Sequence, residues 1–346
     1  MKTVKNMKNY KLLQLVIVMA ITQALVYGQS AYDEMQKVIN AVENNYSGFR
    51  MLKPDQQQPY LNIKQKVLDS ITGCDDVNGQ LKVVKTYLSF FKNNHLCAFA
   101  GDFMSFAIND LGFKLDPPTL IIADSVTIIL TIPSFIGSSK DKIDDLLKKY
   151  QYQLSRVKNL IIDIRGNRGG DDAAFYSLMP LLYTNDFTVY EYYILVSERS
   201  LERYKDQFST EKIEKIKSMT GELVPYSDNK SDISIENSGL KETLNPINIA
   251  IIVDRYVGSS AEQFLFYAKQ SRKVKIFGEN TSGTLDCSNP EMFQFFNNTI
   301  TVTIPTMISA RVWNRAGIEN IGIQPDIYVP DKDEVIDFTK KMLYYW

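Results

Sequence analysis

A serine lies between an apolar run and a helix-like segment in NIAIIVDRYVGSSAEQ, residues 248–263. The β-branched run from Ile249 to Val253 predicts a buried strand, and Ser259-Ser260-Ala261-Glu262 predicts the start of an amphipathic helix. Free amides and the positive end of a helix dipole stabilise an oxyanion that forms beside such a serine. Ser259 is therefore a candidate nucleophile. The alternative is a helix cap, in which Glu262 completes a capping box.

A nucleophilic serine needs a base, and the sequence offers one candidate. No lysine occurs between Lys275 and Lys332, whereas His95, the only histidine, lies in the polar stretch NNHLCAFAGD. An imidazole titrates near neutral pH, so His95 is suited to take the serine proton and return it to a leaving amine. A lone histidine is often structural, but a polar loop is not the usual setting for a core histidine.

Two further segments complete the candidate site. An acid is expected to hold the imidazole in its productive tautomer, and Glu319, between two glycines in GIENIG, is the strongest candidate. The segment RGNRGG follows an apolar run, and Gly169 and Gly170 would leave backbone amides free before a helix. Sites in open α/β sheets form where strands end, so we expect RGNRGG and Ser259 to converge. The alternative is a glycine turn that packs strand against helix.

Strand-like and helix-like segments alternate through the part of the chain that must position these residues. The sequence predicts a hairpin at Asp124-Ser125, a helix at 140–154, a strand at 160–164, a helix at 171–183, strands at 189–196 and 274–277, a hairpin across Asn297-Asn298 and a helix at 333–344. This order predicts an α/β fold, with a mixed, mostly parallel sheet flanked by helices.

The domain organisation follows from the same patterns. Apolar residues at helical spacing predict a small N-terminal helical cap over residues 29–100. Residues 101–346 would form the core, and the charged, polar stretch 197–244 would be a surface helix and loop inserted into it.

The N-terminal residues have the layout of a secretory signal peptide. Lysines precede an apolar run, and cleavage is expected after Gly28, which assigns residues 1–28 to the signal. The protein would then be exported to a periplasmic or extracellular compartment. The alternative is an uncleaved segment that anchors the protein in the membrane.

Composition gives no support for nucleic-acid binding or for a disulfide scaffold. The chain has 346 residues, a net charge of −1 and a pI near 6.0, so nothing favours nucleic-acid binding. Cys74, Cys97 and Cys287 are too few for a disulfide scaffold, and spacing does not decide whether two of them pair. No metal or other cofactor is expected, and the oligomeric state is left open.

Taken together and in order, these segments resemble the C-terminal processing (tail-specific) family of serine peptidases, in its tricorn-like branch. IIDIRGNRGG resembles the family's strand and glycine loop, IIVDRYVGSSAEQF its nucleophile segment, and IFGENTSG and ENIGIQPDI two later motifs, while NNHLCAF occupies the place of its histidine motif. The resemblance covers about residues 95–329. It implies a ClpP/crotonase-like core, polypeptide substrates and serine-type peptidase activity without a cofactor.

Carried over residue by residue, the resemblance assigns a role to each candidate. Ser259 would be the nucleophile, His95 the general base and acid, Glu319 the orienting acid, and the backbone amides of Gly170 and Ser260 the oxyanion hole, with Asn94 and Gly169 in support. The Ser–His–acid arrangement is defined by geometry and not by chain order.

The sequence also departs from the family pattern. Thr284 stands where many members have a catalytic lysine, Asn94 replaces a serine before the histidine, and Arg168 replaces a glycine of the loop. The stretch between His95 and Arg165 leaves no room for the PDZ domain of many members. The substitutions Thr284, Asn94 and Arg168 favour the alternative of an inactive peptide- or lipid-binding protein on the same scaffold. An esterase is a third hypothesis, although the GxSxG motif is absent.

Overall fold

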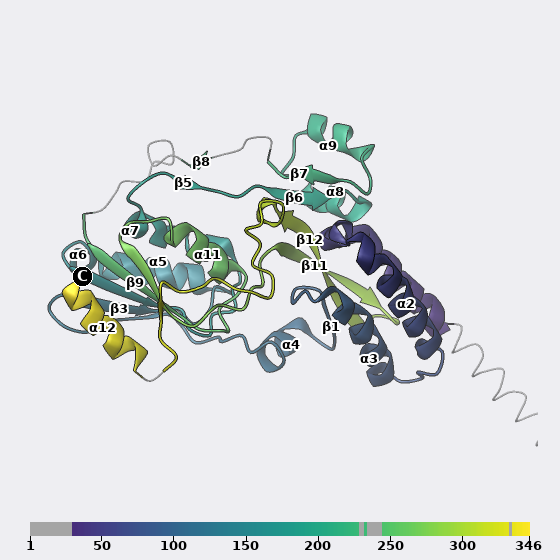
Figure 1. Cartoon of the computed structure of the whole chain (residues 1–346), viewed down its shortest axis with the longest axis horizontal. Coiled ribbons are helices and arrows are strands. Elements are labelled where there is room, and N and C mark those ends of the chain that lie inside the picture. Colours follow the sequence, from purple (N-terminus) through teal and green to yellow (C-terminus); the bar gives the residue numbers. More distant parts are fainter. Residues whose placement is uncertain (1–29, 228–231, 234–243, 332–333) are drawn as a thin grey trace, which may run out of the picture. The chain divides into compact units, whose positions relative to one another are not determined.

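The computed structural model describes residues 30–227, 232–233, 244–331 and 334–346 (Figure 1). The expected signal peptide lies outside this part of the chain. The chain forms two compact units. The smaller unit comprises the residues up to Asp102 together with Leu195–Glu222 and Pro290–Thr306, and the larger unit comprises Phe103–Ile194, Leu223–Asn289 and Met307–Trp346. Each unit is described by itself below.

The larger unit is built on a six-stranded sheet with the order β13-β10-β9-β4-β3-β2. Its strands are β2 (Thr119–Ile122), β3 (Thr127–Thr131), β4 (Asn159–Asp163), β9 (Asn248–Val253), β10 (Val274–Gly278) and β13 (Ile327–Tyr328). All neighbours are parallel except β2, which forms an antiparallel hairpin with β3. The predicted hairpin and the mostly parallel sheet are confirmed.

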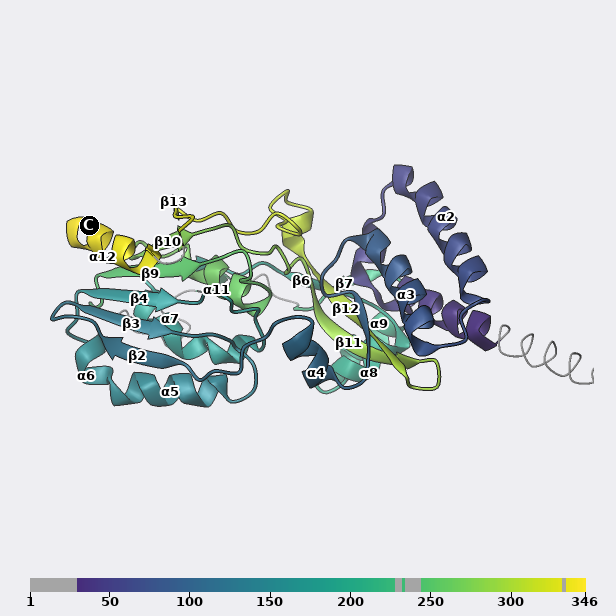
Figure 2. The same ribbon diagram turned by 90° about the horizontal axis from the view of Figure 1, so that it is seen from below.

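Alternate residues of each central strand point to opposite faces of this sheet. On β9, Ile249, Ile251 and Val253 join one apolar cluster, with α5 (Ser139–Lys149) and α11 (Ser260–Ala268). Ala250 and Ile252 join a second cluster on the other face, covered by α12 (Val335–Tyr345) (Figure 2). Burial on both faces explains the uninterrupted apolar runs in the sequence.

The expected helix over residues 171–183 is wrong. This stretch forms three short turns: η3 (Asp172–Ala174), η4 (Tyr176–Leu178) and α7 (Met179–Leu182). The Asp171 side chain accepts a hydrogen bond from the Ala173 amide and caps the first turn. Pro180 has no N–H group, so it cannot continue a helix from the preceding residues. It lies instead in the first turn of α7.

Shorter elements complete the larger unit. The expected helix at 140–154 is divided into α5 and α6 (Gln151–Leu154), and the expected strand at 189–196 is β6 (Tyr192–Leu195). The remaining elements are α4 (Phe103–Asn109), β5 (Phe187–Thr188), which pairs with β8 (Asp232–Ile233), β7 (Leu223–Pro225) and η5 (Ala310–Val312).

Helices dominate the sequence of the smaller unit. They are a helix over residues 30–45, η1 (Ser47–Met51), α2 (Pro54–Ile71), α3 (Val77–Leu88), η2 (Ser89–Phe91), α8 (Glu198–Tyr204) and α9 (Thr210–Lys217). Ring contacts among Tyr46, Phe49, Tyr60, Tyr87 and Phe91 hold the first helices together.

Antiparallel strands accompany these helices. β1 (Cys97–Ala100) pairs with β12 (Ile300–Ser309), so that Cys97 faces Thr303. β11 (Cys287–Phe295) and β12 form the predicted hairpin across Asn297-Asn298, where both asparagines have positive φ, as tight turns require.

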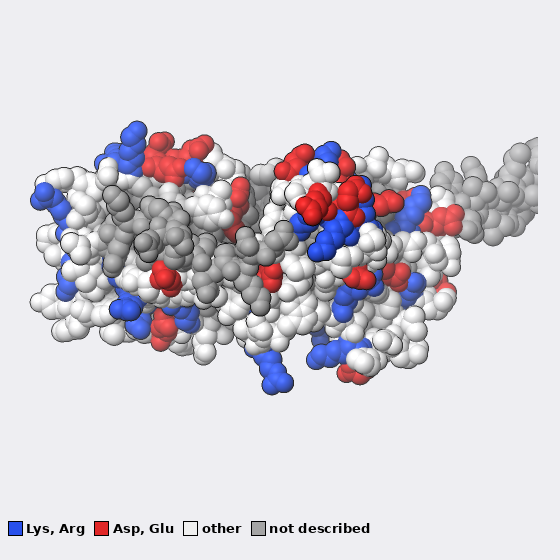
Figure 3. Space-filling model, turned by 90° about the horizontal axis from the view of Figure 1, so that it is seen from above, with Lys and Arg blue, Asp and Glu red and all other residues white. Residues whose placement is uncertain are grey.

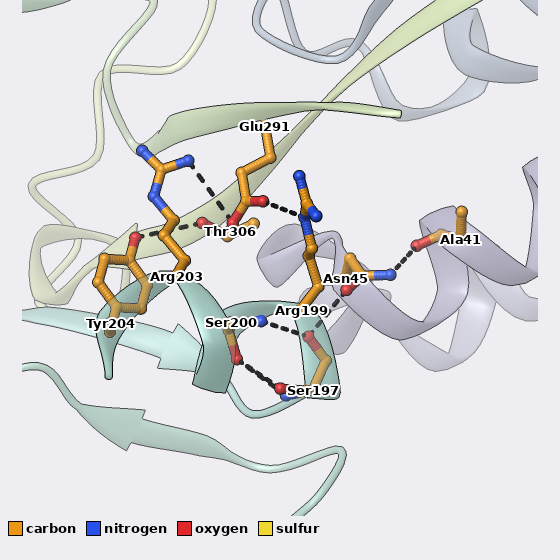
Figure 4. A network of polar contacts seen from close by, with 9 residues as sticks. All are labelled: Ala41, Asn45, Ser197, Arg199, Ser200, Arg203, Tyr204, Glu291 and Thr306. Carbon is orange, nitrogen blue, oxygen red and sulfur yellow. Dashed lines mark hydrogen bonds and ion pairs between the residues drawn. The ribbon is translucent and has the colours of Figure 1, made fainter. Parts of the chain in front are cut away.

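A buried carboxylate fastens α8 to β11 in the smaller unit (Figure 4). Glu291, whose side chain is 5% exposed, accepts a 2.6 Å hydrogen bond from Arg199 Nε and forms an ion pair with Arg203. Ser197 caps α8 and donates to Asn45 Oδ1 at 2.8 Å. The charged stretch that begins at Ser197 is therefore tied to the body of this unit at its N-terminal end.

Surface charge, helix hydrophobicity and the cysteines do not mark a further functional site. On the face shown in Figure 3, basic and acidic side chains are intermixed. Within the described residues, no helix is both long and apolar enough to cross a membrane. Cys74, Cys97 and Cys287 form no disulfide with one another in this structure.

Candidate active site

Ser259 lies at the sharp turn between β9 and α11, as the sequence predicts. Its backbone has φ 54° and ψ −126°, a conformation that costs a non-glycine residue energy and that clusters at functional sites. The Ser259 side chain makes no capping hydrogen bond with the helix. The position therefore does not behave as an ordinary N-cap, and the surrounding structure must hold it in place.

The glycine loop after β4 supports one side of this turn. A methyl group added to Gly169 would lie 2.7 Å from Ser259 Cβ and 2.8 Å from Ser260 N, so only glycine fits here. The Gly258 amide donates to Asn167 O at 3.1 Å, and the fully buried Asn167 side chain accepts from the Gly169 amide at 2.9 Å. The two segments that sequence analysis expected to converge are in direct contact.

The loop of residues 281–284 supports the other side. The Ser259 amide donates to Thr284 O at 3.0 Å, and the Ser282 amide donates to Val257 O at 2.8 Å. Thr284, which stands where many relatives have lysine, has its hydroxyl 3.0 Å from the Ser282 hydroxyl.

Glu262 anchors this second loop from inside α11. Its fully buried carboxylate accepts hydrogen bonds from the Gly283 and Thr284 amides, each at 2.7 Å, and from the Thr281 hydroxyl. Burial raises the pKa of Glu262 above its usual value, while these hydrogen bonds oppose the rise. Sequence analysis considered Glu262 only as part of a capping box, and its role as a loop anchor was missed.

Two backbone amides at the turn are available to an oxyanion. The Gly170 and Ser260 N–H groups have no acceptor among the residues that the structure describes. The Ser260 hydroxyl donates to Gly170 O at 2.8 Å and ties the two residues together. Gly170 has φ 142°, and a methyl group there would lie 2.4 Å from Phe135 O. The fold thus leaves two donors unused beside the serine.

Glu319 belongs to the same assembly of loops. The Asn320 amide donates to Gly283 O at 2.9 Å, which fixes the GIENIG segment to the loop that holds Ser259. The Asp286 carboxylate accepts from the Ile318 amide at 2.6 Å and from the Glu319 amide at 2.9 Å. Asp286 therefore positions the backbone of Glu319, and no pattern in the sequence marked it for this role.

Asp286 is held in turn by a buried arginine. Arg311 is fully buried, and its Nε lies 3.6 Å from Asp286 Oδ1. Its guanidinium carbon lies 4.3 Å from the centre of the Phe266 ring and 5.5 Å from that of Tyr190. Aromatic faces replace part of the water that a buried guanidinium loses.

Asp172 is an unusual carboxyl group near Ser260. Burial raises its pKa from 3.8 to about 6, and the neighbouring Asp171 adds to the rise, while the nearby Ser260 hydroxyl and the charge of Arg311 oppose it. Asp172 therefore changes its charge near pH 6.

His95 lies in the smaller unit, on the turn before β1. The Asn93 side chain accepts from the His95 and Leu96 amides, both at 3.0 Å, and the Thr303 hydroxyl donates to His95 O at 2.7 Å. The residue is partly exposed and outside the apolar core, as expected for a polar loop. Asn94 is exposed on the same turn.

The structure thus brings together most of the candidate residues. Ser259, Ser260, Gly169, Gly170 and Glu319 lie on interlocked loops of the larger unit, whereas His95 and Asn94 belong to the smaller unit. Asn167 was missed individually, although it stands within the RGNRGG motif that signalled the loop.

Comparison with known proteins identifies a relative of this chain. The chain is 27% identical over 223 residues to the nisin-resistance protein of Lactococcus lactis subsp. lactis, with 63% of this chain matched. It spans 61% of the length of that relative.

Solved structures match more of the chain. A lipoprotein from Streptococcus agalactiae is 20% identical with a TM-score of 0.58 over 91% of this chain and 96% of that one. Mature CPAF in complex with lactacystin is 12% identical with a TM-score of 0.60 over 92% and 98%. The tricorn protease gives a TM-score of 0.53 at 14% identity, over 92% of this chain and 37% of its own. These likenesses show a shared fold.

The model of one peptidase family matches residues 127–329, which is more than half of the chain and includes both Ser259 and Glu319. The chain therefore belongs to peptidase family S41.

Proposed function

We propose that this protein is an exported serine endopeptidase that hydrolyses peptide bonds through an acyl-enzyme on Ser259. One observation carries the proposal: a serine in a strained turn lies beside two backbone N–H groups, of Gly170 and Ser260, that no described residue uses. Membership of family S41 supports the same chemistry.

In this proposal His95 acts as the general base. It takes the proton from Ser259 Oγ as the oxygen attacks the carbonyl carbon of the substrate. The carbonyl oxygen becomes an oxyanion and accepts hydrogen bonds from the Gly170 and Ser260 amides. His95 then gives the proton to the leaving amine, and a water molecule, activated in the same way, releases the acyl group from Ser259.

Glu319 would orient the imidazole and stabilise its protonated form. The contacts of Asp286 with the Ile318 and Glu319 amides support a fixed position for this acid.

Export is proposed from the N-terminal sequence, in which lysines precede an apolar run. The matched solved structure of a lipoprotein supports a location outside the cytoplasm. Secretion followed by N-terminal sequencing of the mature protein tests this part, and a mature N-terminus near residue 29 is expected.

The alternative is a binding protein that has kept the scaffold and lost the chemistry. Thr284 at the usual lysine position and Asn94 beside the histidine favour it. Hydrolysis distinguishes the two functions, because a binding protein leaves a bound peptide intact.

The test uses a degenerate peptide mixture, with nisin added because a relative is named for resistance to it. Products are identified by mass spectrometry. Cleavage by the wild type and its loss in Ser259→Ala, with an unchanged circular dichroism spectrum, are expected. Equal cleavage by both proteins would exclude Ser259 as the nucleophile. Tight peptide binding without cleavage by the wild type would establish the alternative.

A further inference from the structure

We propose that a cavity beside the nucleophile turn binds a carboxylate group of the peptide substrate, through Lys114 and Arg168. This inference rests on the proposed function and concerns the substrate class of the same site. The cavity has a volume of about 720 Å³ and lies entirely within the larger unit.

The fold forms this cavity at the carboxyl ends of three neighbouring parallel strands. Its walls come from the ends of β3, β4 and β9: Thr131 and Pro133, then Asp163, Arg165, Gly166 and Arg168, and finally Asp254 and Tyr256. The loop before β2, with Gly112, Lys114 and Asp116, closes another side. Open α/β sheets bind their ligands in this position.

Two of the acidic residues in the wall are already engaged. The Asp163 carboxylate accepts hydrogen bonds from Arg165 Nε at 2.9 Å and from Arg165 Nη2 at 2.6 Å. This ion pair also neutralises the charge of Arg165. Asp254 Oδ1 accepts from the Gly166 and Tyr256 amides, each at 3.0 Å. These carboxylates shape the wall and are poorly placed to attract a cationic ligand.

Two cations in the wall, by contrast, are available. Lys114 and Arg168 form no hydrogen bond or ion pair with any residue in the described part of the chain. The Arg168 guanidinium lies over the Tyr256 ring, 5.0 Å from its centre, and such stacking leaves its in-plane donors free for a carboxylate. Asp116, the remaining carboxylate of the wall, is exposed and has no hydrogen-bond or ion-pair partner among the residues that the structure describes.

The cavity is close to the proposed chemistry. Arg168 directly precedes Gly169, whose added methyl group would touch Ser259, and Tyr256 lies three residues before Ser259. Lys114 reaches the same wall, since its Nζ would lie 2.7 Å from a methyl group on Gly166. A carboxylate held there belongs to a substrate residue near the cleaved bond.

This carboxylate has two sources in a peptide: an aspartate or glutamate side chain, or the C-terminal α-carboxylate. Arginine binds either of them with two parallel hydrogen bonds. A neutral or basic group in the cavity would leave both cations unpaired, which disfavours such substrates.

The experiment measures cleavage of a degenerate peptide library by wild type, Lys114→Gln, Arg168→Gln and the control Lys142→Gln. Lys142 is an exposed lysine on α5, outside the cavity. Its variant therefore loses one positive charge, as the cavity variants do, but leaves the cavity unchanged. A second copy of the library carries C-terminal amides. We expect an acidic residue at one position near the cut, or a free C-terminus, to raise kcat/KM by about tenfold or more.

Both cavity variants should lower this preference by about tenfold, while Lys142→Gln leaves it unchanged. A preference lost in the amidated library identifies the α-carboxylate, and one retained there identifies a side chain. Cleavage without any carboxylate preference, or a preference equal in all variants, overturns the inference and leaves the proposed function standing.

Measuring peptide binding tests the cavity even if the protein cleaves no peptide. The Ser259→Ala protein retains the cavity, so dye-labelled peptide libraries with glutamate or glutamine can be compared by fluorescence anisotropy. Tighter binding of the glutamate library that Arg168→Gln abolishes supports the cavity even if no peptide is cleaved. Equal binding of both libraries, with or without a free C-terminus, contradicts it.

Discussion

At the scale of single residues, the site depends on positions that tolerate little change. Ser259 adopts a strained backbone, and Gly169 and Gly170 leave no space for a side chain beside it. The sequence predicted these positions, because a serine at a strand–helix junction and paired glycines after a strand have local physical uses. It could not predict Asp286 or the loop-anchoring role of Glu262, since their hydrogen bonds join residues that are distant in sequence.

Asp172 gives a pH-dependent prediction at this scale. Its pKa of about 6 in the folded protein lies above that of an exposed aspartate, so its contribution to stability is present at low pH and is lost as pH rises through 6. Asp172→Asn removes the ionisation. The variant should therefore exceed the wild type in unfolding free energy by about 2 kcal/mol at pH 8, and match it near pH 3.5.

Urea unfolding at these two pH values measures the difference. Asp145→Asn serves as the control, because Asp145 is an exposed aspartate on α5. A stability difference for Asp172→Asn that is the same at both pH values would contradict the raised pKa.

At the scale of secondary-structure elements, α11 and its neighbouring loops form a clamp around the nucleophile turn. The loop after β4 holds the turn through Asn167, and the loop after β10 holds it through Thr284. Glu262 connects this second loop to the helix. The strands that end at these loops were predictable, because strands buried on both faces give continuous apolar runs.

Replacing Glu262 by Gln tests this clamp. An amide keeps one acceptor oxygen and presents an NH₂ group to amides that need an acceptor, so buried donors lose their partners. We expect a loss of about 2 kcal/mol in unfolding free energy and about tenfold slower reaction of Ser259 with a fluorophosphonate.

The control for this variant is Glu198→Gln, at the exposed N-terminal turn of α8 in the smaller unit. It removes the same charge without touching the nucleophile turn and should react at the rate of the wild type. A Glu262→Gln protein that reacts equally fast would show that the clamp does not position the serine.

The loop after β4 gives a second prediction. In Gly170→Ala the new methyl group would lie 2.4 Å from Phe135 O, so the loop must move away from the serine. Gly137→Ala is the matched control, since Gly137 also has positive φ, 58°, but open space around its Cβ position. We expect Gly170→Ala to cost about 3 kcal/mol and most of the activity, and Gly137→Ala about 1 kcal/mol.

Thermal unfolding and peptide hydrolysis measured on both variants separate the clash from the effect of positive φ alone. Equal losses of stability and activity in the two variants would mean that contact with Phe135 does not matter.

At the scale of the whole molecule, the sequence predicted the α/β core better than the second, antiparallel set of strands. β1 has four residues, and its partner β12 lies near the other end of the chain, so no local pattern relates them. The prediction of one helix over residues 171–183 was also wrong. It rested on apolar spacing, which takes no account of the missing N–H group of Pro180. Helical residues near the N-terminus were recognised from their spacing alone.

The two units divide the proposed catalytic residues between them. Ser259 and Glu319 belong to the larger unit and His95 to the smaller one. Sequence motifs are read along the chain and do not tell which compact unit a residue joins. The central claim is that the imidazole of His95 activates the hydroxyl of Ser259.

The most direct test is the rate at which a fluorophosphonate modifies Ser259 in wild type and in His95→Ala, with and without added imidazole, and with the modified residue identified by tandem mass spectrometry. The account predicts modification of Ser259 in the wild type, a rate at least about a hundredfold lower in His95→Ala, and partial recovery with imidazole. Modification of His95→Ala at the wild-type rate, or of a serine other than Ser259, would contradict it.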